Sequence, residues 1–149
     1  TKAIFEPGEY EVNNIPIQSH AIKLNTENLD ESTNIYSVIS EGLTICYLNE
    51  ISKISIPAGV TESIGKIDIL ICISNDSSDQ SVESINALLS SLDPKILIIA
   101  EKDSKQDTTE IYEKLIKGLG QSSEDSISNA NITKSGISEA LKVLNLRKS

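Results

Sequence analysis

Two short, nearly continuous apolar runs flank a segment with helical periodicity in the middle of the chain. Residues 67–73 read IDILICI and residues 95–100 read KILIIA, which is typical of strands buried on both faces. Residues 81–92 place four apolar side chains on one helical face: Val82, Ile85, Leu89 and Leu92. A strand, a helix and a strand with short joints form a βαβ unit. We therefore expect an α/β fold with two parallel strands and a right-handed crossover.

The chain before this unit is patterned for antiparallel strands. Residues 15–24 alternate apolar and polar side chains, the period of a half-buried strand. Residues 34–40 and 43–48 are strand-like and are separated by two residues that include Gly42, which predicts a β-hairpin. Residues 10–12 predict a shorter strand, set off by an Asn-Asn turn.

The remaining segments complete a mixed sheet within a single domain over residues 1–149. Residues 49–66 are interrupted by proline and glycine and are predicted to be irregular. Residues 108–117 predict a helix capped by one of the two threonines at its start. Residues 131–134 and 140–146 predict two closing strands.

The charge and the cysteine content exclude several classes of protein. The net charge is −9, from 13 basic and 22 acidic residues, which argues against nucleic-acid partners and anionic membranes. No apolar run is long enough to span a bilayer, and no signal peptide is visible. Cys46 and Cys72 lie inside apolar runs, so we expect buried free thiols rather than a disulfide framework. A cytoplasmic location follows.

Several segments match, in order, those of a known family. The most specific is PGEYEV at residues 7–12. Shorter matches follow along the chain at residues 34–36 (NIY), 41–45 (EGLTI), 68–70 (DIL), 94–98 (PKILI), 132–135 (ITKS) and 143–144 (VL). The chain thus resembles the metallo-β-lactamase fold, and within it the small Zn-dependent hydrolases related to ascorbate-6-phosphate lactonases. The resemblance implies the back half of an αββα sandwich, a mixed sheet with helices on its outer face.

The same resemblance implies a metal site, from which this sequence departs. The family's His-x-His-x-Asp-His motif precedes PGEYEV, and this sequence holds only six residues before that segment. The family's His-Leu-Gly-Asp segment corresponds here to residues 47–50 (YLNE), and its Pro-Met-His-Tyr segment to residues 99–102 (IAEK). Glu50 and Glu101 therefore stand at ligand positions where the family has Asp and His.

The chemistry of these two positions leaves two interpretations. A hydrolytic zinc site needs about three protein ligands and an open position for water. Two glutamates could instead hold a hard cation such as Mg²⁺ or Mn²⁺. Alternatively, Glu50 and Glu101 are solvated remnants of the site. We assign no catalytic or cofactor-binding residue, and Glu50 and Glu101 are the metal-ligand candidates.

Two other polar features have a structural and a functional interpretation. His20 is the only histidine and falls on the strand of residues 15–24, so we expect a surface or half-buried residue, with a general base as the alternative. Asn75, Asp76 and Asp79 follow a predicted parallel strand, where α/β proteins bind ligands. Capping of the next helix is the expected role of these three, and an oxygen-rich cation site is the alternative.

Two functional hypotheses remain. In the first, the chain is a degenerate, non-catalytic metallo-β-lactamase-like domain with a structural or protein-binding role and no cofactor. In the second, it is the C-terminal part of a metal-dependent hydrolase that uses Zn or Mn. The histidine half would then come from a missing N-terminal segment or another chain, an idea motivated by Thr1 and the absence of Met. We also expect a homodimer, because a back half alone leaves one apolar sheet face uncovered.

Overall fold

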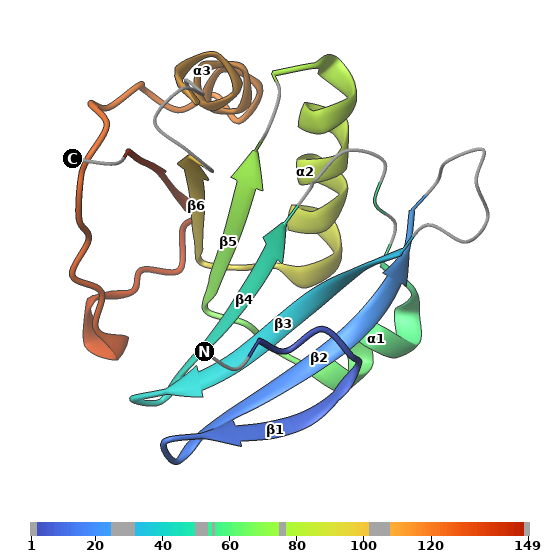
Figure 1. Ribbon diagram of the computed structural model, residues 1–149. Coiled ribbons are helices and arrows are strands. Elements are labelled where there is room, and N and C mark those ends of the chain that lie inside the picture. The colour runs from blue at the N-terminus through green and yellow to red at the C-terminus, as the bar shows by residue number, and fades with distance from the viewer. Residues whose placement is uncertain are drawn as a thin grey trace.

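The described residues form one seven-stranded sheet with three helices. The computed structural model describes residues 3–24, 32–49, 54, 56–74, 77–101 and 108–147. The strands, whose order in the sheet is their order in the chain, are β1 (Gly8–Val12), β2 (Ile15–Lys23), β3 (Ser32–Ser40), β4 (Leu43–Asn49), β5 (Ile69–Ser74), β6 (Ile96–Glu101) and β7 (Lys142–Leu146). The helices are α1 (Ala58–Ile64), α2 (Asp79–Leu92) and α3 (Thr109–Gly118) (Figure 1). No described helix combines the length and the apolar character that a membrane crossing requires.

The first four strands form an antiparallel meander, as their alternation predicts. β1 and β2 are joined by Asn13 and Asn14, both with positive φ angles of 51° and 62°. β3 and β4 are joined by Glu41 and Gly42, with φ angles of 51° and 76°. Two-residue turns of positive φ match the right-handed twist of the paired strands, and Asn and Gly tolerate this conformation. The hairpin predicted around Gly42 is confirmed.

The parallel half of the sheet confirms the βαβ unit. β4, β5, β6 and β7 pair in parallel, and α2 connects β5 to β6. α2 begins two residues earlier than the predicted segment, because the Ser78 side chain accepts a hydrogen bond from the Ser81 N–H and is the N-cap. It ends as predicted before Pro94, where Asp93 is left-handed and its N–H donates to the Leu89 carbonyl.

The secondary structure predicted for two segments was wrong. Residues 49–66 were expected to be irregular, yet α1 begins directly after Pro57, whose fixed φ suits the start of a helix. Residues 131–134 were expected to form a strand, yet residues 134–136 form a 3₁₀ turn. Ile132 and Ile137 pack onto one face of the sheet. The segment therefore covers the sheet and does not add a strand to its edge.

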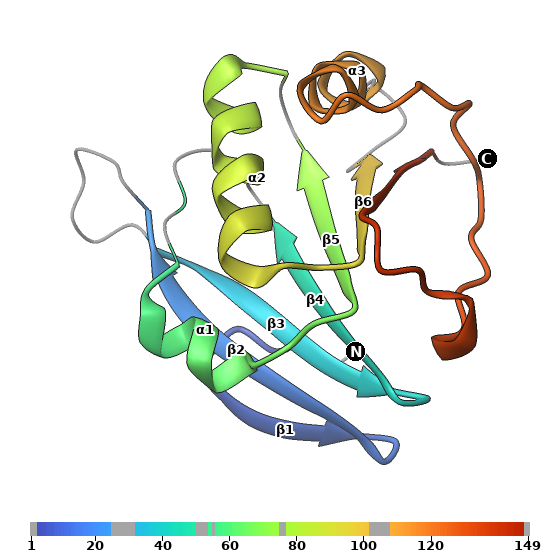
Figure 2. The same cartoon turned by 180° about the vertical axis from the view of Figure 1, so that it is seen from behind.

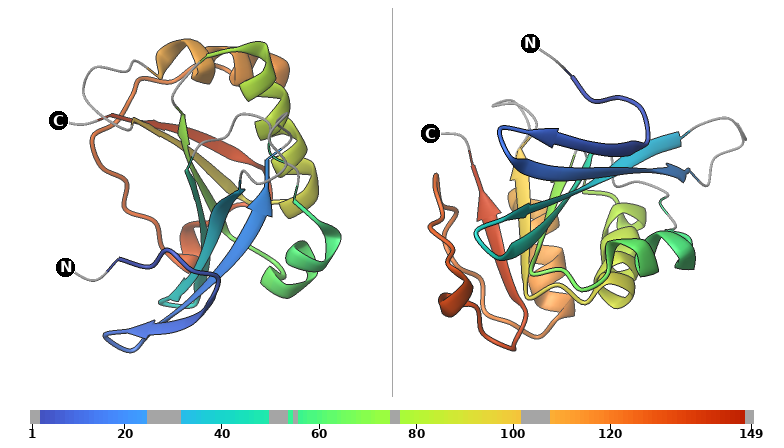
Figure 3. Two further views of the ribbon diagram at one scale, coloured as in Figure 1. Left: turned by 45° about the vertical axis from the view of Figure 1, so that its right-hand side comes forward. Right: turned by 90° about the horizontal axis from the view of Figure 1, so that it is seen from below.

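The main core lies between the sheet and the helices, which all cover the same face (Figure 2). Buried side chains of the sheet meet Ile64 of α1, Ile85 of α2 and Leu115 of α3. We call this side of the sheet the helix face and the other side the open face. A smaller cluster on the open face covers parts of β4 to β7, where residues after α3 cross the sheet (Figure 3). The mixed sheet with helices on one side therefore agrees with the α/β expectation.

Candidate functional site

The carboxyl ends of three parallel strands define the edge where the sequence placed its metal-ligand candidates. β4 ends at Asn49, β5 at Ser74 and β6 at Glu101, and the Cα of Glu101 is in register with Ser74. β5 lies between the other two strands, so the ends of β4 and β6 are separated by about 9.5 Å, twice the strand spacing. The other candidates at this edge, Glu50, Asn75 and Asp76, lie outside the described residues.

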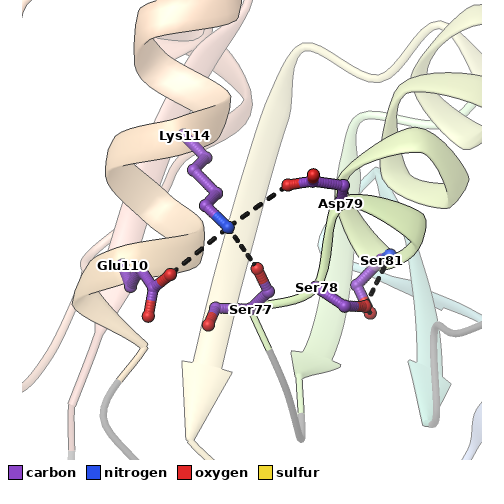
Figure 4. A network of polar contacts seen from close by, with 6 residues as sticks. All are labelled: Ser77, Ser78, Asp79, Ser81, Glu110 and Lys114. Carbon is purple, nitrogen blue, oxygen red and sulfur yellow. Dashed lines mark hydrogen bonds and ion pairs between the residues drawn. The ribbon is translucent and has the colours of Figure 1, made fainter.

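A lysine holds the start of α2 to α3 at the same end of the sheet. The Lys114 ammonium of α3 donates to the Ser77 carbonyl at 2.7 Å and lies 3.3 Å from the Asp79 carboxylate. The Glu110 carboxylate, one helical turn before Lys114, lies 3.2 Å away (Figure 4). Asp79 was expected among the caps of α2, but Ser78 is the N-cap and Asp79 pairs with Lys114 instead. One positive charge of the chain itself is therefore shared between two carboxylates here.

The Lys114 cluster shifts the protonation of its members. A hydrogen bond with Ser77, followed by the contact with Lys114, holds the pKa of Glu110 below its ordinary value. The hydrogen bond to Glu110 raises the pKa of Lys114 in return. Glu110 and Lys114 are therefore both charged at neutral pH. The Lys114 ammonium links α3 to α2 through its ion pair with Asp79.

Lys114→Met is expected to raise the pKa of Glu110 part of the way toward its ordinary value. The hydrogen bond with Ser77 remains in the variant, whereas the charge of Lys114 is lost. Carbon-detected NMR titration of the glutamate carboxyls measures the shift. Lys117→Met, a matched change on the exposed side of the same helix, is expected to leave Glu110 unchanged. An equal shift in both variants would contradict this assignment.

A buried polar pair fixes the start of α3 against β7. The Thr108 hydroxyl donates to Oδ1 of Asn145 at 2.6 Å, and both residues are almost fully buried. Either Thr108 or Thr109 was expected to cap α3, and Thr108 occupies the N-cap position. Its hydroxyl makes no capping bond, however, because it satisfies the buried amide of Asn145.

Thr108→Val is expected to lower the free energy of unfolding by about 2 kcal/mol. The change keeps the side-chain volume but leaves Oδ1 of Asn145 buried without its donor, which is the costly outcome for a polar pair. Chemical denaturation followed by circular dichroism measures the loss. The control Thr133→Val alters an exposed threonine and is expected to cost less than about 0.7 kcal/mol. Equal losses would argue against the Thr108–Asn145 bond.

The sulfur and imidazole groups lie away from the carboxyl edge. Cys46 and Cys72 are buried free thiols in the main core, as expected, and burial raises the pKa of each to about 12. His20 lies on β2 and is half-buried, as its strand position predicted. Its Nε2 and the Ser19 hydroxyl are buried and make no hydrogen bond within the described residues. Both residues line a cavity of about 380 Å³ beside the start of β1 and Val60 of α1.

The opposite, amino edge of the parallel strands carries a buried carboxylate that the sequence analysis did not single out as a site. Asp68 accepts a hydrogen bond from the Thr44 N–H at 2.9 Å and one from the Lys134 ammonium at 2.7 Å. Its backbone carbonyl also accepts the N–H groups of Lys95 and Ile96. Burial alone would raise the pKa of Asp68, but Lys134 and the Thr44 N–H outweigh it and hold the pKa below its ordinary value.

Asp68 lines a cavity of about 340 Å³ that is rich in charged groups. The cavity is lined by Thr44, Lys66, Asp68, Lys95, Lys134, Ile137 and Glu139. Two of its three lysines have partners within the cluster: Lys95 lies 3.5 Å from Glu139, and Lys134 binds Asp68. The arrangement joins β4, β5, β6 and the 3₁₀ turn, so its clearest role is structural.

In the described parts of the chain, no group of three or more His, Cys, Asp or Glu side chains is arranged to hold a metal ion. The structure therefore brings Glu101 to the carboxyl edge but describes no donor set around it. The polar groups that it does bring together are the Lys114 cluster, the Thr108–Asn145 pair and the Asp68 cluster. Each joins separate elements of the fold through hydrogen bonds or ion pairs among its own members.

Comparisons with known proteins bear on the fold. No protein-family model matches the chain, and no curated protein does. Among solved structures, the chain is similar to a protein of Thermotoga maritima described as a candidate Zn-dependent hydrolase of the metallo-β-lactamase superfamily. The TM-score is 0.70 at 18% sequence identity, and the alignment covers 99% of this chain and 73% of that chain. At this level of identity the likeness shows the fold: an α/β protein that matches a metallo-β-lactamase-superfamily structure.

Proposed function

We propose that the chain is a non-catalytic domain with the metallo-β-lactamase fold and a structural or protein-binding role. The observation that carries this proposal is the position of its zinc-type donors. The sequence holds one histidine and two cysteines, and these are the nitrogen and sulfur ligands that zinc prefers. In the fold, these three side chains do not meet at the carboxyl edge.

The geometry of each donor supports this view. The metal-binding form of cysteine is the thiolate, and a pKa of about 12 keeps Cys46 and Cys72 protonated in the core. His20 lies on β2, four strands away from β6, which corresponds to about 19 Å. A side chain cannot reach from His20 to a ligand position at the end of β6.

The oxygen donors leave one narrower possibility for a metal. Glu50 and Glu101 would offer carboxylates, which favour Mg²⁺ or Mn²⁺ over zinc. A water on such a cation is activated less than a water on zinc held by three protein ligands. We therefore treat these two glutamates as remnants of the family's site in the proposed domain.

Hydrolysis assays test the proposal. Purified chain is incubated with a phosphodiester and with a lactone, in the presence of Zn²⁺, Mn²⁺ or Mg²⁺ in turn. The expected rate is that of the buffer with the same metal. A rate above this background that falls in the Glu50→Gln/Glu101→Gln double variant would overturn the proposal. The double variant of the exposed pair Glu62→Gln/Glu113→Gln is the control for a nonspecific loss of charge.

A second candidate function is supported by the length of the similar structure. About a quarter of the T. maritima chain has no counterpart in this one. The chain would then be the rear part of a metal-dependent hydrolase, and an upstream segment or another polypeptide would supply the His-x-His-x-Asp-His half and bind Zn or Mn. The PGEYEV segment at residues 7–12 supports the finer relation to the ascorbate-6-phosphate lactonase group. The DNA upstream of the Thr1 codon tests the first form of this candidate, which fails if no histidine pair is encoded there; supply by another polypeptide fails if no partner with that motif restores metal-dependent hydrolysis to the chain.

A further inference from the structure

The open face of the sheet is apolar from β1 to β5. Strand alternation points ten large apolar or aromatic side chains that are not fully buried to this side: Tyr10, Val12, Ile15, Ile17, Tyr36, Val38, Ile45, Tyr47, Ile71 and Ile73. Val12 is 48% exposed, whereas Ile45 and Ile71 pack in the smaller cluster together with Ile132 and Ile137. Large apolar patches of this kind mark contact surfaces rather than ordinary exteriors.

The open face is also almost free of charge. The chain carries 35 charged residues, the 13 basic and 22 acidic ones together. Among the positions of β1 to β5 that point to the open face, Lys23 at the end of β2 is the one charged residue. The acidic residues of β1, Glu9 and Glu11, point to the other side, because their register partners are Gln18 and Pro16. Charge depletion of this kind is typical of the core of an interface.

Two tyrosines lie in the middle of the open face. Tyr36 and Tyr47 are register partners on β3 and β4, with ring centroids 6.1 Å apart. The first described residues of the chain run over the neighbouring part of this face, since the Tyr36 hydroxyl donates to the Ile4 carbonyl and Asn34 donates to the Phe5 carbonyl (Figure 3). The Phe5 side chain remains 80% exposed beside them. Tyrosine and phenylalanine are enriched where proteins bind each other.

We infer that a second copy of this chain packs on the open face, around a twofold axis that brings the two faces together. The inference deepens the proposed protein-binding role, on which it rests, by naming the partner. Charge favours this occupant. Two molecules that each carry −9 repel each other, and the open face is the side on which they meet without opposing carboxylates. An uncharged patch is also complementary to itself, as a twofold contact requires.

The size of the open face sets the strength of the dimer. Five strands at the usual spacing, each about six residues long, give a footprint of at most about 500 Å² per copy. Residues 4–5 and the side chains of Ile132 and Ile137 already cover parts of it. Two copies therefore bury less than about 1,000 Å², the size of a weak, transient contact. We expect a reversible dimer with a dissociation constant of about 100 μM, since interfaces of this size leave little surplus over the cost of association.

Sedimentation velocity from 1 to 500 μM chain tests the dimer directly. The expected result is a concentration-dependent shift from 16.2 kDa to twice that mass. Raising NaCl from 0.05 to 0.5 M is expected to tighten the dimer several-fold, because salt screens the repulsion between the two acidic chains. A single-chain mass at every concentration, or a dimer that loosens with salt, would overturn the inference.

A matched pair of variants on one strand locates the contact. Val38→Glu adds a charge to the open face and is expected to weaken dimerisation at least tenfold. Ile39→Glu changes the next residue of β3, which points to the other side and is 51% exposed, and should leave dimerisation unchanged. Equal effects of both variants would overturn the inference. Circular dichroism verifies the fold, and Ile17→Glu replaces Val38→Glu if that variant is unfolded.

Sedimentation tests the dimer, and the hydrolysis assays test the proposed function, so the two can be rejected independently. A hydrolase that dimerises would overturn the non-catalytic assignment and leave the partner assignment intact. A monomer without hydrolase activity would overturn the partner assignment alone, and the open face would then belong to a different occupant.

Discussion

Leu97→Ala is expected to lower the free energy of unfolding by about 3 kcal/mol, a large share of the 5–15 kcal/mol typical of a domain. Leu97 is the second residue of β6 and is completely buried. It is in register with Leu70 of β5 and Val143 of β7, and all three belong to the core under the helices. Truncation leaves a cavity that neighbouring strands cannot close without breaking their pairing.

Urea denaturation measures this loss, and Leu144→Ala is its matched control. Leu144 lies on β7 and points to the open face, where it is half-buried at the smaller cluster. Its truncation is expected to cost about 1 kcal/mol, because much of the removed side chain was already in contact with water. Equal losses at the two leucines would contradict the placement of the main core on the helix face.

Asp68→Asn is expected to lower the free energy of unfolding by about 1.5 kcal/mol at pH 7 and by much less in acid. The amide keeps an acceptor for the Thr44 N–H but loses the charge that holds Lys134 at 2.7 Å. The folded-state pKa of Asp68 lies below its unfolded value. Its charge therefore adds stability above about pH 4, and this stability is lost as the pH falls through the folded-state pKa.

Unfolding by urea at pH 7, 5, 3 and 2 measures this dependence for wild type and variant. The two stability curves are expected to converge at the lowest pH. Lys134→Met completes a double-variant cycle and should show coupling with Asp68→Asn at pH 7, whereas Lys142→Met, another lysine on the exterior, should not. A stability difference that stays constant down to pH 2 would mean that the charge of Asp68 does not account for its effect.

Much of the fold follows from local sequence signals. The apolar run at residues 67–73 and the periodicity of residues 81–92 reflect burial, which local composition records directly. The two-residue turns at Asn13 and Gly42 follow from the few residue types that accept positive φ angles. α1 was missed because Pro57 was interpreted as a helix breaker, although proline at a helix start has the opposite effect.

The clusters were harder to predict, because they join distant parts of the chain. Asp68 interrupts an apolar run, and a buried carboxylate needs a partner, so the sequence carries a signal for it. Its partner Lys134 is 66 residues away in the sequence, so only the three-dimensional structure shows that the two side chains meet. Thr108 and Asn145 likewise meet only once α3 packs beside β7. The segment at residues 131–134 holds one apolar side chain, Ile132, which packs on a face of the sheet instead of pairing within it.

The metal-ligand assignment remains a prediction at both glutamates. Glu50 lies outside the described residues, and Glu101 is placed by its backbone at the end of β6. What the structure adds is the position of the other donors. Cys46 and Cys72 are in the core and His20 is on a distant strand, so a zinc site at this edge would have to be built without them.

Zinc titration by calorimetry tests the central claim most directly. The purified chain, freed of metal by chelation, is titrated with Zn²⁺, and its metal content after dialysis is measured by mass spectrometry. The expected result is less than about 0.1 zinc per chain and no saturable heat below about 100 μM, since catalytic zinc requires about three protein ligands in one place. One or two tightly bound zinc ions per chain, lost in the Glu50→Gln/Glu101→Gln variant, would contradict the claim that this domain has no catalytic metal site.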